Sequence, residues 1–170
     1  MKTYTKKLVL SSLFAALTLV ATLFFALPLP TGYANLGDCF AFLGGFMIGG
    51  AWGVAAAGIG SALADIIGGY GIYALATFII KAFIALCGVM AFKLAAKSKI
   101  KLLPIMALSL LGEVMMVLGY FFFESVFLGV GAAAIASVAG NLTQAAVGVV
   151  TSSALAMVFD KNKRLKSLIK

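Results

Sequence analysis

Six long apolar segments, separated by short stretches of turn-forming residues, make up almost the whole chain. The segments run over about 8–27, 36–49, 52–67, 72–92, 102–124 and 131–159. The breaks between them hold Pro28 and Pro30, Gly49-Gly50, Gly68-Gly69, the lysines of 97–101, and residues 125–131. At about 1.5 Å per residue, the first segment spans roughly 30 Å, the thickness of one hydrocarbon core. We predict an all-α membrane bundle of six helices, forming one domain over residues 1–170.

The second and third segments are short for independent membrane spans. At about 1.5 Å per residue they reach only roughly 20–24 Å each. We therefore expect residues 36–49 and 52–67 to form a tilted helical pair next to a re-entrant or loop-filled region. Such a region is tolerated only where protein or water covers its backbone.

The composition supports the membrane class and excludes a soluble domain. Of 170 residues, 64% are hydrophobic and 11% are charged, and the mean hydropathy is +1.16. Residues 1–27 resemble a secretory signal, but the apolar run is too long and the residues after it form a poor cleavage site. The first segment is therefore expected to remain as a transmembrane helix. The two cysteines, Cys39 and Cys87, are read as packing residues, and the chain has no histidine.

Twelve of the thirteen basic residues fall in three regions of the sequence. These are the N-terminus, the 92–102 loop and the C-terminal tail. With six helices, all three regions lie on the same side of the membrane, and the positive-inside rule makes that side cytoplasmic. Both termini are thus predicted to be cytoplasmic, and the net charge of +8 needs no nucleic-acid partner.

Five charged residues are not explained by topology. Asp38, Asp65, Lys81, Glu113 and Glu124 lie inside the apolar segments or at their outer ends. Ionisable groups at such positions are costly unless they are paired or face a cavity, so each is a candidate for a functional site. The alternative is that they form internal ion pairs that only fix the packing of the helices.

Helical spacing arranges polar residues in one stripe on each of three segments. Tyr73, Thr77 and Lys81 follow each other at four-residue intervals. Glu113, Tyr120 and Glu124 share one face of the fifth segment, and the sixth has a stripe of its own, formed by Ser137, Asn141, Gln144 and Gly148. Counted from the outer ends, Lys81, Glu113 and Asn141 reach similar depths of about 14–16 Å. We predict that the stripes converge on a pocket open to the outside, although Tyr33, Tyr70 and Tyr73 have an alternative role as interfacial anchors.

Asp38 stands directly before the apolar run of the second segment, close behind Tyr33 and Asn35. A carboxylate suits the N-terminus of a helix, so one reading is that Asp38 caps this helix. The functional reading is that the 28–38 loop folds over the mouth of the pocket as a lid.

The predicted pocket combines aromatic faces, amides, one cation and several carboxylates. This set suits a small planar heterocycle with hydroxyl or amino groups. We expect no cofactor or metal, and no enzyme activity, because no nucleophile–base pair can be assembled. The chain lacks a G-x-x-x-x-G-K-[ST] motif, so energy for uphill transport must come from a partner or a coupled ion.

Small residues mark possible docking faces for a partner. Ser12 and Ala16 have a small-xxx-small spacing, as do Ser11 and Ala15, and Gly49 and Gly53 repeat it around the inner turn. Such faces allow helices to approach closely. The alternative is that they pack within this chain.

The stretches TGYANLGD, GIGSALADIIGGYGIYALATFIIKA and GNLTQAAVG resemble the S components of energy-coupling-factor (ECF) vitamin transporters. The nearest branch is that of riboflavin, hydroxymethylpyrimidine and pyridoxine uptake. The resemblance implies a multi-pass subunit of a prokaryotic cell membrane that binds a vitamin and joins a membrane coupling subunit and two cytoplasmic ATPases. It also implies substrate binding at these residues: Asn35, Asp38, the 65–73 loop, Lys81, Glu113, Asn141 and Gln144. Family members commonly carry an AxxxA docking motif in the first helix, where this chain has Ser12 and Ala16.

The resulting hypothesis is a vitamin-binding S component that takes a pyrimidine or pyridine vitamin. The small pocket and the position of Trp52 on the inner turn favour a small ring. The alternatives are a riboflavin-specific S component, a self-sufficient carrier that couples transport to an ion through Glu113 and Lys81, and a structural membrane protein without a ligand.

Overall fold

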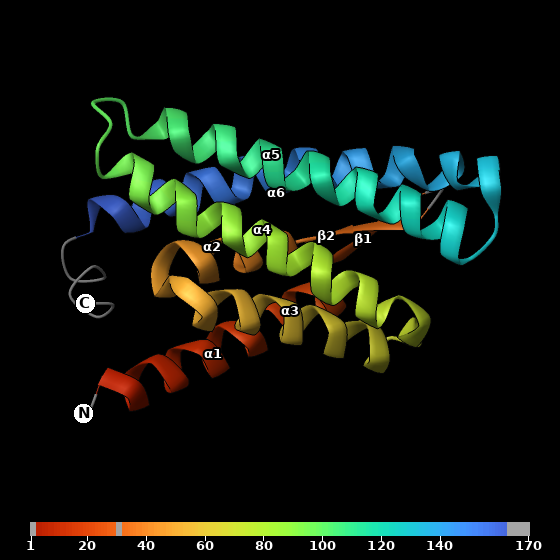
Figure 1. Ribbon diagram of the computed structural model, residues 1–170, viewed down its shortest axis with the longest axis horizontal. Coiled ribbons are helices and arrows are strands. Elements are labelled where there is room, and N and C mark those ends of the chain that lie inside the picture. Colours follow the sequence, from red (N-terminus) through yellow and green to blue (C-terminus); the bar gives the residue numbers. More distant parts are fainter. Residues whose placement is uncertain (1–2, 30–31, 163–170) are drawn as a thin grey trace.

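The computed structural model describes residues 3–29 and 32–162, and it confirms the predicted all-helical architecture (Figure 1). The six helices are α1 (Thr3–Phe24), α2 (Gly37–Ile48), α3 (Gly50–Ile67), α4 (Ala74–Ala95), α5 (Leu102–Phe122) and α6 (Ile135–Lys161). Five helical segments of the described chain are long and apolar enough to cross a membrane. Only α2, with 12 residues, is shorter. The expectation that the third segment is also too short was wrong, because α3 begins earlier and has 18 residues.

A short antiparallel hairpin, β1 (Ala26–Leu29) and β2 (Gly32–Asn35), replaces most of the predicted 28–38 loop. The first helix was expected to reach residue 27, but α1 ends at Phe24. Pro28 has no backbone N–H and cannot continue a helix. Inside an apolar bundle the remaining N–H and C=O groups need partners, and strand pairing such as Leu27 with Ala34 supplies them. The strand β2 lies against α6.

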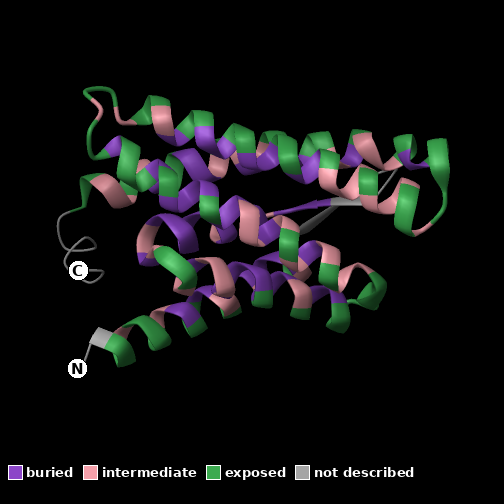
Figure 2. Ribbon diagram, viewed as in Figure 1, coloured by how far each residue is buried: buried purple, intermediate pink, exposed green. Residues whose placement is uncertain are grey.

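The helix α4 lies at the centre of the packing and contacts α2, α3 and α5. The helix α1 packs on α2 and α3, while α6 packs on α5 and α2. Buried residues face the interior of the bundle and exposed residues face outward (Figure 2). The core contains Phe42, Leu43, Ile84, Ile105 and Met116, each with at most 1% of its surface exposed. Because most of the outward-facing large side chains are apolar, this surface suits contact with lipid.

Glycines allow α2 and its neighbours to approach to backbone contact. A Cβ at Gly45 would overlap the backbone carbonyl of Ala85 in α4. A Cβ at Gly53 in α3 would overlap the backbone of Gly44. Gly49, in the turn between α2 and α3, has a φ of 71°, which a glycine adopts without strain. Gly53 therefore packs against another helix of the same chain. This agrees with the alternative that its small size serves internal packing and not the docking of a partner.

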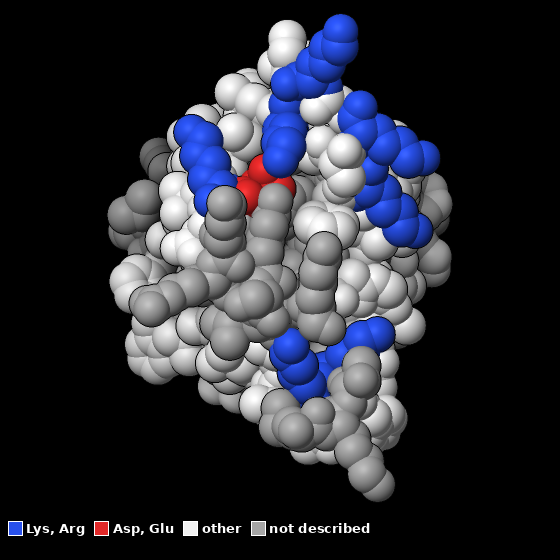
Figure 3. All heavy atoms as spheres, turned by 90° about the vertical axis from the view of Figure 1, so that its left-hand side faces the viewer, with Lys and Arg blue, Asp and Glu red and all other residues white. Residues whose placement is uncertain are grey.

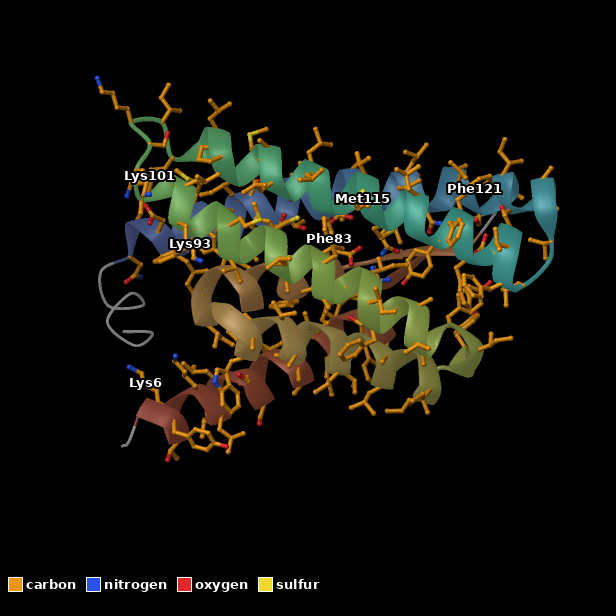
Figure 4. The ribbon with its side chains drawn as sticks, viewed as in Figure 1. Lys6, Phe83, Lys93, Lys101, Met115 and Phe121 are labelled. Carbon is orange, nitrogen blue, oxygen red and sulfur yellow. The ribbon has the colours of Figure 1, made fainter. Side chains whose placement is uncertain are left out.

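The basic residues of the described chain gather at one end of the bundle, with Lys81 as the exception. Lys6, Lys93 and Lys101 lie at the end of the bundle where α1 begins and α6 ends (Figure 4). A view onto this end shows lysine side chains around it (Figure 3). Lys101 forms an ion pair of 2.7 Å with Asp160. The opposite end, formed by the 68–73 and 123–134 connections, contains no lysine or arginine.

Candidate substrate-binding site

A buried polar network joins three helices and the hairpin in the middle of the bundle. Lys81 of α4 forms an ion pair with Asp38 of α2, and these residues are only 3% and 0% exposed. The side-chain amide of Gln144 in α6 donates to the second carboxylate oxygen of Asp38 at 2.5 Å. The amide of Asn35 in β2 donates to Gln144 Oε1 at 3.2 Å. Every charged group of this network is therefore neutralised and held by its neighbours.

Asp38 lies at the N-terminal end of α2, as the capping alternative expected, but it makes no capping hydrogen bond. The helix α2 has no side-chain cap, and Asp38 lies in its first turn. The Asn35 carbonyl oxygen Oδ1 instead accepts a hydrogen bond from the Gly37 backbone N–H at 2.8 Å, which orders the entry to the helix. Asp38 is thus free to bind Lys81 and Gln144, while its carboxylate stays near the positive end of α2.

Glu113 of α5 lies beside this network, with 1% of its surface exposed. Its carboxyl group packs against Gly148 of α6, where a Cβ would overlap it. Among the described residues, Glu113 Oε2 has no hydrogen-bond partner. Glu113 and Asp38 form a layer behind the cavity described next, and neither lines it.

A cavity of about 170 Å³ lies above the network, toward the end of the bundle that lacks basic residues. Nine of the twelve residues predicted to bind substrate line it: Asn35, Asp65, Tyr70, Tyr73, Thr77, Lys81, Tyr120, Asn141 and Gln144. Tyr33 belongs to β2, but its side chain lies outside the described part of the structure. The predicted stripes on three helices therefore do meet around one hollow.

Five further residues that were not predicted to bind also line the cavity: Thr22, Ser61, Glu124, Ser137 and Gly140. Glu124 and Ser137 belong to the polar stripes, so their helical spacing already indicated that they face the cavity. Thr22 lies four residues after Thr18 on the first helix, but this helix was not among those predicted to carry a polar stripe. Ser61 stands in a run of small residues, which is typical of close helix packing.

The wall formed by α4, α5 and α6 carries aromatic rings and paired polar groups. Glu124, in the π-helical turn Phe123–Phe127, accepts hydrogen bonds from Tyr73 at 3.4 Å and from Ser137 at 2.5 Å. The hydroxyl groups of Thr77 and Tyr120 lie 2.9 Å apart. The Lys81 ammonium lies 5.5 Å from the centroid of the Tyr120 ring, a cation–π distance. A π-helical turn often marks a functional position in a helix.

The cavity offers aromatic faces together with amides, hydroxyls and carboxylates, which is the chemistry of a site for a polar aromatic ligand. No cluster of metal-binding side chains occurs among the described residues. Outside the cavity, Ser12 and Ala16 lie on an exposed face of α1. Ser11 is buried, and Ala15 packs on Gly60 of α3. Of the two small-residue pairs of α1, Ser12 and Ala16 thus lie on its exposed face, and Ser11 and Ala15 lie on the face that packs inside the bundle.

Comparison with known proteins agrees with this architecture. A protein family described as "ECF-type riboflavin transporter, S component" matches residues 2–161. A protein of Pyrococcus woesei, described as "Uncharacterized protein in gap 3'region", is 34% identical over 144 residues, which cover 84% of this chain and 93% of that protein. The chain therefore belongs to the family of ECF-type riboflavin transporter S components, multi-pass membrane subunits that bind the substrate of a transporter and are not enzymes.

Proposed function

We propose that the chain captures riboflavin in the cavity between α3, α4, α5 and α6 and delivers it to an ECF importer. The single observation that carries the choice of vitamin is the match of nearly the whole chain to the riboflavin-type family. This match favours the riboflavin alternative over the pyrimidine or pyridine vitamin that the sequence suggested. That preference rested in part on Trp52, which packs on Tyr4 at a ring distance of 5.3 Å and does not line the cavity.

The lining of the cavity supports a flavin. Riboflavin has a flat three-ring system with hydrogen-bonding groups along one edge and a chain of hydroxyl groups. Tyr70, Tyr73 and Tyr120 supply aromatic surface for the ring system. The amide of Asn141, which has both a donor and an acceptor, suits the ring edge. Since riboflavin has no net charge at neutral pH, a cavity whose lysine is already paired suits it well.

The direction of uptake and the partners follow from charge and surface. The basic end of the bundle is cytoplasmic by the positive-inside rule, so the cavity lies nearer the external side. The chain has no phosphate-binding loop. A membrane coupling subunit and two ATPases, the partners that the family implies, would supply the energy. The exposed face around Ser12 and Ala16 is the docking surface that we propose for the coupling subunit.

Quenching of riboflavin fluorescence by the purified subunit tests the substrate. We expect tight binding of riboflavin and far weaker binding of pyridoxine and hydroxymethylpyrimidine, measured by competition. Asn141→Ala should weaken riboflavin binding, whereas Leu110→Ala, on the exposed face of α5, should not. Tight binding of pyridoxine without binding of riboflavin would exclude a flavin and favour the pyrimidine or pyridine vitamin that the sequence suggested.

Liposomes that contain only this subunit test the alternative of an ion-coupled carrier. The buried Lys81–Asp38 pair and the adjacent Glu113 are the groups that such a carrier would use. We expect no accumulation of riboflavin against a gradient when a proton or sodium gradient is imposed. Concentrative uptake under these conditions would contradict the S-component mechanism.

A further inference from the structure

The polar atoms around the cavity fall into two groups. On the side of α4, α5 and α6, most are already paired within the protein. Gln144 binds Asp38 and Asn35, Glu124 binds Tyr73 and Ser137, and the lysine is in an ion pair. A ligand on this side meets groups whose strongest hydrogen bonds are already made.

The opposite side, formed by α3, contains two buried polar atoms without partners. Ser61 Oγ and Asp65 Oδ2 make no hydrogen bond to any described residue. Ser61 is 1% exposed and Asp65 is 6% exposed, and both line the cavity. They are one helical turn apart, at i and i+4, and so they face the same direction. Leaving such atoms buried and unpaired is unfavourable, and hydrogen bonds from a bound ligand would relieve that cost.

The position of this pair is fixed by the packing of α3. A Cβ at Gly60 would overlap the backbone of Ala15 in α1, so α3 is seated directly on that helix. On another face, Gly58 lies against the ring and the carbonyl of Phe78 in α4. The helix therefore has little freedom to turn Ser61 and Asp65 toward other partners. The site is preorganised for groups that enter through the cavity.

We infer that Ser61 and Asp65 form a hydroxyl-binding subsite that holds the ribityl chain of riboflavin. A carboxylate oxygen accepts a hydrogen bond from a hydroxyl group, and a serine hydroxyl both donates and accepts. Two such groups one helical turn apart, about 6 Å along the helix, can each bind a different hydroxyl group of an extended sugar-alcohol chain. The flat ring then occupies the tyrosine-lined side. This inference rests on riboflavin as the proposed substrate.

The test compares riboflavin with lumiflavin, which carries a methyl group in place of the ribityl chain. In the unaltered protein we expect riboflavin to bind more tightly than lumiflavin. Ser61→Ala should weaken riboflavin binding by about tenfold, and Asp65→Asn by about ten- to a hundredfold, because a hydrogen bond to a charged group is stronger. Both variants should keep the affinity for lumiflavin within about threefold, since they remove no contact with the ring.

Ser109→Ala is the matched control, because Ser109 is a buried serine that pairs with Ser152 at 2.6 Å and does not line the cavity. It should change neither affinity. Thermal unfolding of each variant shows whether the bundle is intact, and the lumiflavin affinity reports separately on the rest of the pocket. Equal losses for both flavins, or no loss for riboflavin, would overturn the subsite while leaving the substrate proposal in place. Failure of the unaltered protein to bind either flavin would overturn both.

Discussion

Removing one partner of the buried Lys81–Asp38 pair is predicted to destabilise the bundle strongly. In Lys81→Met, the Asp38 carboxylate would stay 0% exposed and would keep one donor, the amide of Gln144. Breaking a buried pair in this way costs about 3–5 kcal/mol, and we expect the lower end because Gln144 remains. For a chain of this length, about 3 kcal/mol lowers the unfolding temperature by roughly 6–12 °C.

The assay uses the two buried cysteines of the protein. Cys39 and Cys87 are 2% and 1% exposed, so a maleimide dye that fluoresces on reaction with a thiol reports the opening of the bundle during heating. Lys97→Met, at an exposed position of the basic end, is the control and should stay within about 0.5 kcal/mol of the unaltered protein.

The double variant Lys81→Met/Asp38→Asn separates charge from shape. It removes the unpaired charge while keeping a polar group beside Gln144, so it should recover at least half of the lost stability. If the double variant unfolds at the same temperature as Lys81→Met, the loss comes from the shape of Lys81 and not from its charge. The view of a neutralised network would then be refuted.

Three further predictions concern packing, selectivity and docking. Gly45→Ala should lower the free energy of unfolding, measured by thermal unfolding, by about 1–3 kcal/mol or more, because the new Cβ meets a backbone carbonyl of α4. Gly71→Ala is the control and should not lower it, because the space around its Cβ is open. FMN, which adds a phosphate, should compete with riboflavin at least about a hundredfold less well. Among the described residues that line the cavity, Lys81 is the one lysine and is already paired, and the lining includes carboxylates. Ser12→Trp should leave flavin binding intact but prevent assembly with the coupling subunit, measured by co-purification; retained assembly would place the docking face elsewhere.

The helices could be predicted from the sequence because the length of a membrane span is set by the bilayer. Apolar runs and glycine or proline breaks therefore marked all six helices to within a few residues. The hairpin was missed because each of its strands has only four residues, and Pro28 obscures the alternation of a strand. The π-helical turn at Phe123–Phe127 has no simple sequence signal, so the fifth segment read as one regular helix.

The candidate site could be predicted in part, for a geometric reason. Periodicity fixes which residues of a helix share a face, and so Tyr73, Thr77 and Lys81 line the cavity together. The rotation of one helix against another depends on packing between distant segments, which a single sequence does not reveal. Periodicity therefore placed Glu113 on the polar face of its helix but could not reveal that it does not line the cavity. Ser61 was missed because a serine among glycines and alanines is also typical of close helix packing.

The residues that stabilise the interior of the bundle are different from the residues that are available to bind a ligand. Beneath the cavity, Lys81 and Asp38 neutralise each other and are held by Gln144, while Glu113 lies beside this network. Of the buried polar atoms without partners in the described chain, the two that line the cavity belong to Ser61 and Asp65 of α3, where a neutral ligand with hydroxyl groups can satisfy them without bringing a charge into the membrane. Because the floor already holds its own partners, selectivity for the ligand must come from the α3 side and from the shape of the aromatic wall. Conservative changes at Ser61 and Asp65 should therefore alter which flavin is bound, whereas changes at Lys81 and Asp38 should alter whether the bundle is stable enough to bind one.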